Sequence, residues 1–435
     1  MNLLTNKRLN LDIIDIISNL SIELQIKTFL VGGYVRDLIL SRESKDIDVL
    51  VIGDGISFAK EVKKKLDTKV NLQIFKNFGT AMIIYDGFEI EFVGSRKESY
   101  QKSSRNPSIT VGTFEDDISR RDFTINSIAI SLNKNDKGKI IDLFGGLSDL
   151  KSGIIKTPKD PKITFYDDPL RMMRAVRFAS QLNFKIKDSN LEIIKNDRER
   201  INIISKERIN DELNKILLSP KPSIGFILLK NTGLLEIIIP ELIKLEGIDE
   251  IEGKSHKDNF YHTLQVLDNI CKNTDNLWLR WVALLHDIGK PKTKRYSKKK
   301  GWSFHGHEYV GSKMVFKIFK RLKLPLNNKL NYVKKLVLLS SRPVILSSDE
   351  ITDSAIRRLI FDAGDDIDEL MTLCEADITT KNSKLEKKYL NNFKVVRKKI
   401  EDVENRDRVR NFQPPISGEF IMNYFGIKPC KEIGL

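Results

Sequence analysis

Residues 28–53, TFLVGGYVRDLILSRESKDIDVLVIG, decide the fold of the N-terminal part of the chain. A short apolar run leads into the pair Gly32-Gly33, and a helix is expected to begin there. A second strand is expected to begin at Asp46-Ile47-Asp48. Because successive side chains of a strand point to opposite faces, Asp46 and Asp48 should project from the same face. The order of strand, glycine turn, helix and strand predicts a mixed α/β domain.

The two aspartates and the glycine pair together favour a site for a nucleoside triphosphate. Neighbouring carboxylates repel each other unless a cation lies between them, and Mg²⁺ is commonly bound by one or two carboxylates plus substrate phosphates. Gly32 and Gly33 would let the backbone approach the triphosphate at a helix N-terminus, and Arg36 could bind phosphate oxygens. Taken alone, each motif is more often a solvated strand end or a turn. Their order predicts Mg²⁺ at Asp46 and Asp48.

Further periodic segments extend this domain and then give way to helices. Strands are expected at 71–75, 79–87 and 89–94 and a helix at 56–66, with Asp86-Gly87 as a hairpin turn. The segment 94–119, rich in Ser, Lys and Arg, is expected to be a mobile loop. From about residue 168 the pattern becomes helical, and it is interrupted near residue 250.

Composition limits the class of protein. The chain has 435 residues, of which 40% are hydrophobic and 31% charged, so a globular protein is expected and disorder is excluded. No apolar run approaches the length of a membrane span. The three cysteines, Cys271, Cys374 and Cys430, are far apart, which speaks against a disulfide framework and fits the cytoplasm.

Charge points to a polyanionic partner. The formal net charge of +15 favours nucleic acid, although a lysine-rich proteome would give the same value. The segment 290–300, KPKTKRYSKKK, carries no acid. It could follow a phosphate backbone, or it could be an ordinary solvated loop.

The glycine pair, the two aspartates and the motif RRDFTIN at 120–126 resemble the nucleotidyltransferase superfamily of DNA polymerase β. The resemblance is to the branch of CCA-adding enzymes and bacterial poly(A) polymerases. It implies Glu91 as a third acid on the sheet, although Glu89 lies on the same face of its strand. It also implies that Arg121, Asp122 and Asn126 contact the sugar and phosphates of the nucleotide.

A third motif, DDPLR at 167–171, resembles the EDxxR motif of the same family, with Asp167 in place of Glu. Asp168 and Arg171 are neighbours on a helix. A carboxylate accepts a hydrogen bond from the amine of cytosine or adenine, and a guanidinium donates to the ring nitrogen, so the pair would select CTP and ATP without a nucleic-acid template. Asp168 could equally be a helix cap. Arg174 and Arg177 are expected to face phosphate or the primer.

A histidine–aspartate cluster marks the second half of the chain. All five histidines lie between His256 and His307. Their spacing resembles the HD phosphohydrolase superfamily, which implies a site for a transition metal. The implied ligands are His262, His286, Asp287 and Asp377. His307 is a further ligand or a phosphate contact, whereas Ser340 and Ser341 stand where some members carry another histidine. A one-metal hydrolase and a vestigial site therefore both remain open.

The expected architecture is an α+β nucleotidyltransferase head with a mixed sheet at 1–150, an all-α neck with RNA-binding function at 151–250, an α-helical HD domain at 251–385 and a tail at 386–435. The tail stops at KPCKEIGL, where the family it resembles continues with another helix, so it is expected either to be truncated or to lack part of the segment that grips tRNA. The resemblance implies that CMP and AMP are added from CTP and ATP to the 3′ end of tRNA, with pyrophosphate release. A poly(A) polymerase, an HD phosphohydrolase with an inactive head and a pure RNA-binding protein remain alternatives.

Overall fold

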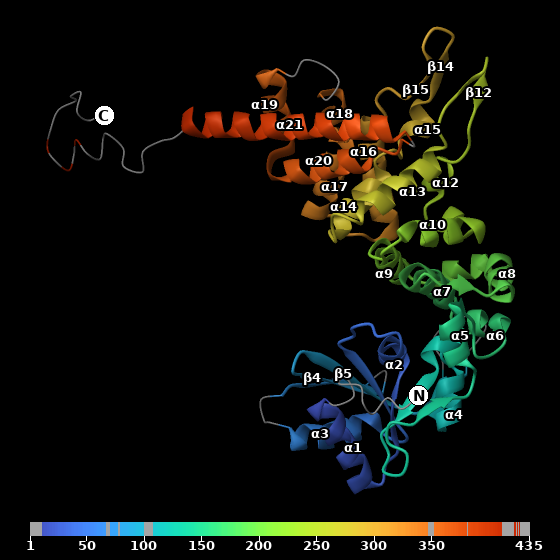
Figure 1. The fold of residues 1–435 in the computed structure, drawn as a ribbon. Helices are drawn as coiled ribbons and strands as arrows, with labels where there is room; N and C mark the ends of the chain where they lie inside the picture. The colour runs from blue at the N-terminus through green and yellow to red at the C-terminus, as the bar shows by residue number, and fades with distance from the viewer. Residues whose placement is uncertain are drawn as a thin grey trace. The chain divides into compact units, whose positions relative to one another are not determined.

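The chain forms two compact units in the computed structural model (Figure 1). Residues 11–66, 70–76, 79–99, 108–346, 352–380 and 382–410 are described, together with positions 422, 424 and 426. One unit comprises Met1–Glu246 and Ile318–Leu324, and the other comprises Gly247–Lys317 and Pro325–Leu435. The last residues of the sequence, KPCKEIGL at 428–435, lie outside the described residues.

The first unit contains a mixed sheet, which has seven strands within the described residues, in the order β3-β4-β5-β2-β1-β8-β9. Its strands are β1 (Thr28–Val31), β2 (Asp46–Val51), β3 (Leu72–Phe75), β4 (Thr80–Tyr85), β5 (Phe88–Gly94), β8 (Ile128–Ser131) and β9 (Ile140–Asp142). β2 and β5 run parallel, and the other neighbouring pairs are antiparallel. The sheet thus has the mixed strand directions expected of the head.

Helices α1 (Asp12–Leu24), α2 (Gly32–Ile39) and α3 (Gly55–Lys65) pack around this sheet. α3 begins where the Asp54 carboxylate accepts hydrogen bonds from the backbone N–H groups of Ile56 and Ser57. Leu50 lies on the same face of β2 as Asp46 and Asp48, and it joins a buried cluster with Ile118 of α4 (Phe114–Ser119). α4 therefore holds the residues that follow it against the same sheet face that carries the aspartates.

The turn between β4 and β5 is the predicted hairpin. Tyr85 pairs with Phe88, and both Asp86 (φ 49°) and Gly87 (φ 76°) adopt the left-handed conformation. Two successive positive φ angles define the two-residue turn that suits the twist of paired strands. This prediction from the Asp-Gly pair is confirmed.

The prediction of a mobile loop at 94–119 is wrong for the described part of that segment. β6 (Arg96–Ser99) and β7 (Ser108–Val111) pair as an antiparallel hairpin, and α4 follows directly. Thr113 and Asp116 form a reciprocal capping box that starts α4. The predicted loop at 100–107 lies outside the described residues. The helix start signal was present in the sequence, but the polar composition concealed it.

The remainder of the first unit is mainly helical. Its elements are η3 (Thr124–Asn126), α5 (Gly146–Ser152), β10 (Ile154–Ile155), α6 (Pro161–Asp167), α7 (Leu170–Leu182), β11 (Lys185–Ile186), α8 (Asp188–Asn196), η4 (Arg198–Ile203), α9 (Lys206–Leu217), α10 (Pro222–Asn231), α11 (Leu234–Ile238) and α12 (Pro240–Ile243). α7 is the central helix, because it packs against α9, α10 and α6 and buries Met172, Met173 and Val176 completely.

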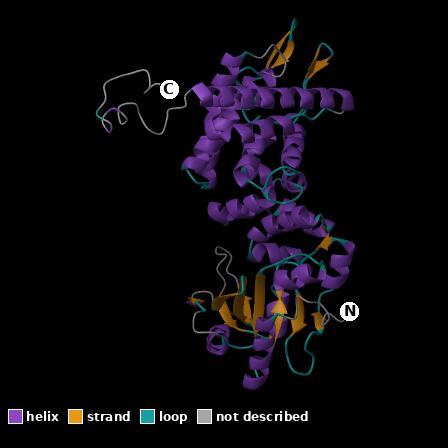
Figure 2. Ribbon diagram, turned by 60° about the vertical axis from the view of Figure 1, so that its left-hand side comes forward, coloured by secondary structure: helices purple, strands orange, loops and turns teal. Residues whose placement is uncertain are grey.

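The helices from residue 259 onward, apart from the C-terminal end of α16, form the second unit around a buried α14, with two small hairpins beside them (Figure 2). The helices are α13 (Asn259–Ile270), α14 (Leu277–Leu285), α15 (Lys290–Thr293), α16 (His307–Leu322), α17 (Asn328–Leu339), α18 (Arg342–Leu346), α19 (Asp353–Ala363), α20 (Ile367–Ala376) and α21 (Ser383–Arg410). The hairpins are β12 (Glu250–Ile251) with β13 (Lys254–Ser255), and β14 (Arg295–Ser297) with β15 (Gly301–Ser303). α14 packs against α13, α17 and α20 and buries Trp281 completely.

Two general features of the described residues bear on the sequence expectations. None of their helices is both long and apolar enough to cross a bilayer. The described cysteines, Cys271 and Cys374, are both free thiols.

Candidate active site

Four carboxylates share one face of the sheet in the first unit. Asp46 and Asp48 alternate with the buried Ile47 in β2, so both project from the same face. Asp48 lies opposite Glu91 of β5, and Asp46 lies opposite Glu89. A cleft of about 510 Å³ opens here and is lined by Asp48, Glu91, Arg96, Arg120 and Arg121, among others. Of the two glutamates considered for the third acid, only Glu91 lines this cleft.

The pKa of Asp48 depends on its burial and on the charged groups that surround it in the cleft. Burial raises the pKa of its carboxyl group to about 6; Arg121 opposes this shift, and Glu91 and Asp46 add to it. Crowded carboxylates of this kind are stabilised by a cation between them. An all-oxygen donor set suits a hard divalent cation. The residues present therefore fit a divalent metal at this face of the sheet.

Gly32 begins α2 and lies directly against Asp48. Its φ of 74° belongs to the left-handed region, and a Cβ atom at this position would come within 2.4 Å of Asp48 Oδ2. Any larger residue would therefore be strained and would also displace the carboxylate. Gly33 follows with its backbone in α2. The first glycine of the predicted pair is thus required by its contact with the acid.

A buried carboxylate that the sequence analysis missed holds the two arginines of the cleft. Asp117 is completely buried in α4 and accepts hydrogen bonds from Arg120 Nε at 2.9 Å and from Arg121 Nη2 at 3.1 Å. The Nε atom of Arg121 is buried and has no hydrogen-bond partner. Arg121 therefore has a donor left for an anionic ligand. The available signal was the spacing of three and four residues, which makes side chains neighbours on a helix.

Arg36 has protein partners where the sequence predicted phosphate. Its guanidinium donates from Nε and Nη2 to Asp37, at 3.0 and 2.7 Å, and from Nη1 to Asn126 at 2.9 Å. Only about 10% of the side chain is exposed. A buried guanidinium needs such partners to offset its lost hydration. The geometry makes Arg36 an organiser of the site, and a phosphate contact would require these bonds to break.

Asp122 continues this network away from the sheet. Its carboxylate accepts from Asn126 Nδ2 at 2.9 Å and from Arg174 Nε at 2.7 Å. Burial alone would raise the pKa of Asp122, but Arg174 and Asn126 outweigh burial and lower the pKa to about 2. Asp122 and Asn126 therefore connect the first strands of the head to α7.

The arginines of α7 are also engaged within the protein. Arg177 Nε lies 2.6 Å from Oε2 of the buried Glu212 of α9. The guanidinium groups of Arg36, Arg174 and Arg177 all lie over the ring of Phe178, at 4.9, 5.4 and 4.1 Å from its centroid. Arg174 and Arg177 were expected to face phosphate or primer, but the tertiary structure pairs them with carboxylates. Neither the Glu212 partner nor the stacking on Phe178 was predicted from the sequence.

The predicted base-reading pair lies at the start of α7. Asp168 Oδ1 accepts from the backbone N–H of Leu170 at 3.1 Å, so the capping role considered for Asp168 is present. Asp168 Oδ2 makes no hydrogen bond with the described residues. Arg171 Nη2 donates to the backbone oxygen of Arg120 at 2.8 Å. This bond ties the predicted base reader to the chain segment that carries the cleft arginines.

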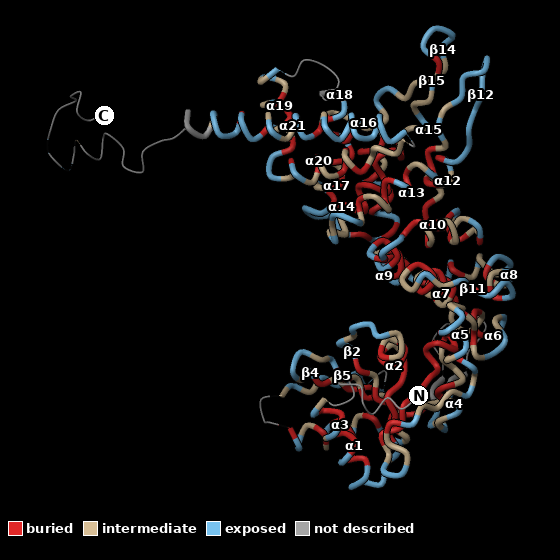
Figure 3. Tube along the Cα trace, viewed as in Figure 1, coloured by how far each residue is buried: buried red, intermediate tan, exposed pale blue. Residues whose placement is uncertain are grey.

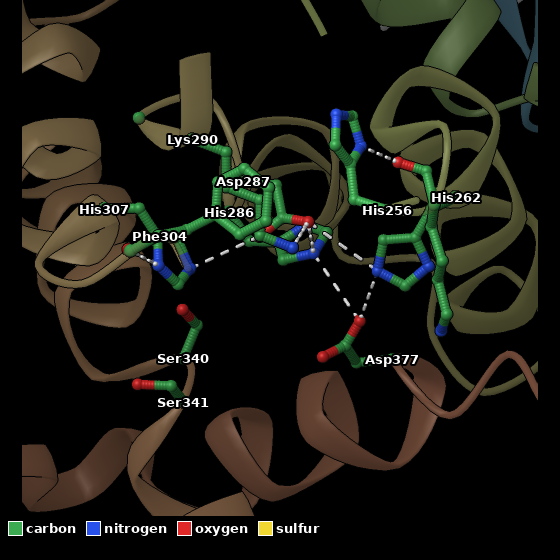
Figure 4. A network of polar contacts seen from close by, with 12 residues as sticks. His256, His262, His286, Asp287, Lys290, Phe304, His307, Ser340, Ser341 and Asp377 are labelled. Atoms are coloured by element: carbon green, nitrogen blue, oxygen red, sulfur yellow. Dashed lines mark hydrogen bonds and ion pairs between the residues drawn. The ribbon is translucent and has the colours of Figure 1, made fainter. Parts of the chain in front are cut away.

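The second unit contains the predicted metal ligands as one cluster (Figure 4). His262 Nε2 lies 2.9 Å from Asp377 Oδ1 and 3.6 Å from Asp287 Oδ2. His286 Nε2 lies 3.3 Å from Asp287 Oδ2 and 3.6 Å from Asp377 Oδ1. The residues come from α13, from the C-terminal end of α14 and from the end of α20. The structure therefore brings all four predicted ligands together.

The geometry of this cluster fits a metal ion. His286 Nδ1 lies 2.8 Å from the backbone oxygen of Ala283, and His262 Nδ1 lies 2.9 Å from Thr379 Oγ1. Such bonds orient imidazoles so that Nε2 faces the metal. His286 Nε2 and Asp377 Oδ1 are buried and make no hydrogen bond of good geometry, although other groups of the cluster lie close to both, so a metal ion would satisfy both. Burial lowers the pKa of His286, but Asp287 and Asp377 outweigh burial and raise it to about 10.

Two more nitrogen-bearing side chains approach the same cluster from the other side. His307 Nε2 lies 3.4 Å from Asp287 Oδ1, and Lys290 Nζ lies 2.6 Å from Asp287 Oδ2. Ser341 Oγ bonds to Glu308, and Ser340 Oγ donates to a backbone oxygen of its own helix. His307 is thus adjacent to the cluster, whereas the serines have other partners.

Three family models match the chain, in the order of the expected domains. Residues 28–156 match the poly A polymerase head domain, and residues 183–245 match the probable RNA and SrmB-binding site of polymerase A. Residues 259–382 match the HD domain.

Several proteins of known name are similar in sequence to part of the chain. The chain is 38% identical to a CCA-adding enzyme of Lactobacillus helveticus over 270 residues, which are 61% of this chain and 62% of that protein. It is 35% identical to an A-adding tRNA nucleotidyltransferase of Geobacter sulfurreducens over 267 residues, which are 61% of this chain and 28% of that protein. The chain therefore spans less than two thirds of the length of these relatives.

Solved structures confirm the predicted fold class, an α+β head followed by a helical part. The Thermotoga maritima CCA-adding enzyme complexed with tRNA_CCA matches with a TM-score of 0.63 and 22% identity, over 99% of this chain and 89% of that one. A tRNA nucleotidyltransferase complexed with a primer tRNA and an incoming ATP analog matches with a TM-score of 0.62 and 24% identity, over 88% and 98%. The chain therefore combines, in the order expected from the sequence, regions similar to a poly A polymerase head domain, to its probable RNA-binding site and to an HD domain.

Proposed function

We propose that this chain adds CMP and AMP to the 3′ end of tRNA, without a nucleic-acid template, from CTP and ATP. The observation that carries the proposal is the acidic face of Asp46, Asp48 and Glu91 beside Gly32 and Arg121. Relatives named CCA-adding enzyme and A-adding tRNA nucleotidyltransferase support it. The proposed domains are the head at 1–150, the neck at 151–250, the HD domain at 251–385 and the tail from 386.

In the proposed reaction the RNA 3′-hydroxyl attacks the α-phosphate of the nucleotide, and pyrophosphate leaves. Asp46, Asp48 and Glu91 are the residues that would hold Mg²⁺, which lowers the pKa of the hydroxyl and stabilises the leaving group. Gly32 leaves room for the Asp48 carboxylate, and Arg121 offers its unpartnered Nε to the triphosphate. Asp117 keeps Arg121 oriented toward the cleft.

Asp168 and Arg171 are proposed to select the base. Asp168 Oδ2 is available to accept from the amine of cytosine or adenine, while Oδ1 caps α7. Arg171 would donate to the ring nitrogen. The network of Arg36, Asp122, Asn126 and Arg174 is proposed to hold α7 against the head while each base is read. Arg177 would support this network indirectly, through its ion pair with Glu212.

Primer extension on tRNA lacking its CCA end tests this function. With CTP and ATP in Mg²⁺, we expect three nucleotides to be added in sequence, which is the definition of CCA addition. Asp48→Ala should abolish incorporation, with a circular-dichroism melt that matches the unaltered protein. Wild-type incorporation by this variant would contradict the proposal.

The same assay separates the two narrower alternatives. Two relatives are named A-adding enzymes, so a chain that extends only primers already ending in CC would be an A-adding enzyme. A chain that adds many adenylates to varied RNA would be a poly(A) polymerase. We propose the cytoplasm as the location, in keeping with the free thiols of Cys271 and Cys374.

A metal-dependent phosphohydrolase activity of the second unit is a second proposal. It is favoured by the buried His286 Nε2 and Asp377 Oδ1, which make no hydrogen bond of good geometry, in a cluster of imidazoles and carboxylates. That mixed donor set suits a transition metal better than Mg²⁺. The test is metal analysis after dialysis, with hydrolysis of p-nitrophenyl phosphate measured in parallel. Absence of bound metal at saturating Mn²⁺, Co²⁺ or Ni²⁺ would overturn this proposal.

A further inference from the structure

Two adjacent hairpins in the second unit form a strongly basic projection that the proposed active sites do not use. The segment 290–300 contains seven lysine and arginine residues and no acid. It supplies β14 and the turn that leads to β15. Strands β13 and β15 pack together, so the two hairpins lie side by side. Figure 3 shows their ends as exposed.

Specific contacts fix the two hairpins to each other. Trp302 Nε1 donates to the backbone oxygen of Lys254 at 2.9 Å, and Lys254 Nζ donates to the backbone oxygen of Lys298 at 2.8 Å. The rings of Tyr296 and Trp302 lie 5.2 Å apart across the β14–β15 pair. These contacts order the strands, so the lysines of the turn are presented from a structured support.

Two acids of the first hairpin segment pair with two lysines of the second hairpin segment. Asp249 pairs with Lys294, and Glu252 lies 3.6 Å from Lys298 while accepting from Tyr296 Oη at 3.1 Å. Four exposed cations have no acidic partner among the described residues. They are Lys292, Arg295, Lys299 and Lys300. These four side chains therefore carry positive charge that no described acid compensates.

We propose that this projection, formed by β12–β13 and β14–β15, binds the phosphate backbone of RNA. Uncompensated lysine and arginine side chains bind phosphates without reading sequence. The turn at 297–300 is Ser-Lys-Lys-Lys and has no apolar side chain, whereas a segment that enters a membrane surface needs apolar anchors. The nearest large rings, those of Tyr296 and Trp302, pack on each other. The choice of RNA over other polyanions rests on the function proposed above.

Salt-dependent RNA binding tests the proposal. The hairpin variant combines Lys292→Gln, Arg295→Gln, Lys299→Gln and Lys300→Gln. The matched control removes four exposed lysines of α21 in the same unit, through Lys384→Gln, Lys387→Gln, Lys394→Gln and Lys398→Gln. Each lost phosphate contact lowers the slope of log affinity against log salt by roughly 0.7–0.9. We expect the hairpin variant to lose about three in slope and about tenfold or more in affinity for tRNA, measured by filter binding with the full chain.

Each outcome of this experiment either supports or overturns the proposal. Equal slopes for the hairpin variant and the unaltered protein, or equal losses in both variants, would overturn the proposal. Loss of binding to phosphatidylserine vesicles with unchanged RNA binding would overturn it in favour of a membrane surface. Matching thermal melts show that the variants are folded. Nucleotide incorporation is a separate readout. If the hairpins contribute to RNA binding but the protein adds no nucleotide, the result contradicts the proposed function and leaves the RNA-binding proposal standing.

Discussion

Single side chains in the cleft depend on buried partners that touch no substrate. Asp117 is such a residue, because its carboxylate holds both Arg120 and Arg121 while it is itself completely buried. The same holds for Asp122, which joins Asn126 to Arg174. Substitutions that keep shape and remove charge separate this orienting role from packing.

Asp117→Asn should weaken use of the nucleotide more than it weakens the fold. A neutral amide holds the two guanidinium groups less firmly, and misplacement of a charged group by about 1 Å costs roughly a hundredfold in rate. We expect kcat/KM for CTP to fall about 10- to 100-fold, with most of the change in KM. Steady-state kinetics provide the measurement, and Glu115→Gln, exposed on the same helix, is the control. Equal kinetics in both variants would refute the orienting role.

Asp122→Asn should lower stability in a pH-dependent manner. The folded pKa of Asp122 is about 2 and its ordinary value is 3.8, so its ionised form stabilises the fold above pH 3.8. This contribution, about 2 kcal/mol, is lost as pH falls through 2. Removing the charge also leaves Arg174 without its partner, which costs roughly 3–5 kcal/mol at neutral pH. Urea unfolding should therefore show a large deficit at pH 7 that shrinks toward pH 2. A deficit that stays constant with pH would argue against the ion pair.

At the scale of elements, the turn between β1 and α2 determines whether Asp48 can take its position. Gly32 combines a left-handed backbone with a close approach to the carboxylate. Gly87 in the β4–β5 turn has a similar φ of 76°, but no atom lies within 4 Å of the position its Cβ would take. The close approach to a carboxylate is therefore particular to Gly32. The two glycines form a matched pair.

Gly32→Ala and Gly87→Ala should therefore separate strain from displacement of the acid. Both variants place a Cβ in the left-handed region, at a cost of about 1–2 kcal/mol in the free energy of unfolding. Only Gly32→Ala pushes against Asp48 Oδ2, so only this variant should lose incorporation, by about a hundredfold or more. Thermal melts and primer extension measure the two effects. Similar activity in both variants would show that Gly32 acts through the backbone alone.

At the scale of the whole molecule, the two acidic centres belong to separate compact units. The cleft around Asp48 lies in the first unit, and the cluster around His286 lies in the second. Each centre has its own core and its own buried charges. Loss of one site should consequently leave the other unit folded.

His286→Ala should remove metal from the second unit and leave nucleotide addition intact. The imidazole supplies a buried ligand atom that makes no hydrogen bond of good geometry with the described residues, so metal affinity should fall by about 10- to 100-fold or more. Elemental analysis after dialysis measures the bound metal, and primer extension in Mg²⁺ measures the head. A parallel loss of incorporation would show that the sites are coupled. Thr263→Ala, on the same helix as His262, serves as a folding control.

The sequence by itself determined the features that repeat over a few residues. Strand alternation placed Asp46 and Asp48 on one face, and the Asp86-Gly87 pair specified the hairpin turn. The resemblance to HD proteins implied the set of His262, His286, Asp287 and Asp377, which lie together in the structure. These features follow from local backbone geometry or from motifs whose order reflects the fold, so they can be read without coordinates.

Only the tertiary structure decided which charged groups meet. Arg36 meets Asn126 across 90 residues, Arg174 meets Asp122 across 52, and Arg177 meets Glu212 across 35. The sequence therefore predicted three arginines facing a ligand, whereas the fold gives each of them a carboxylate or amide partner. The physical reason is that a buried charge must be paired, and the available partner depends on which helix packs against which strand.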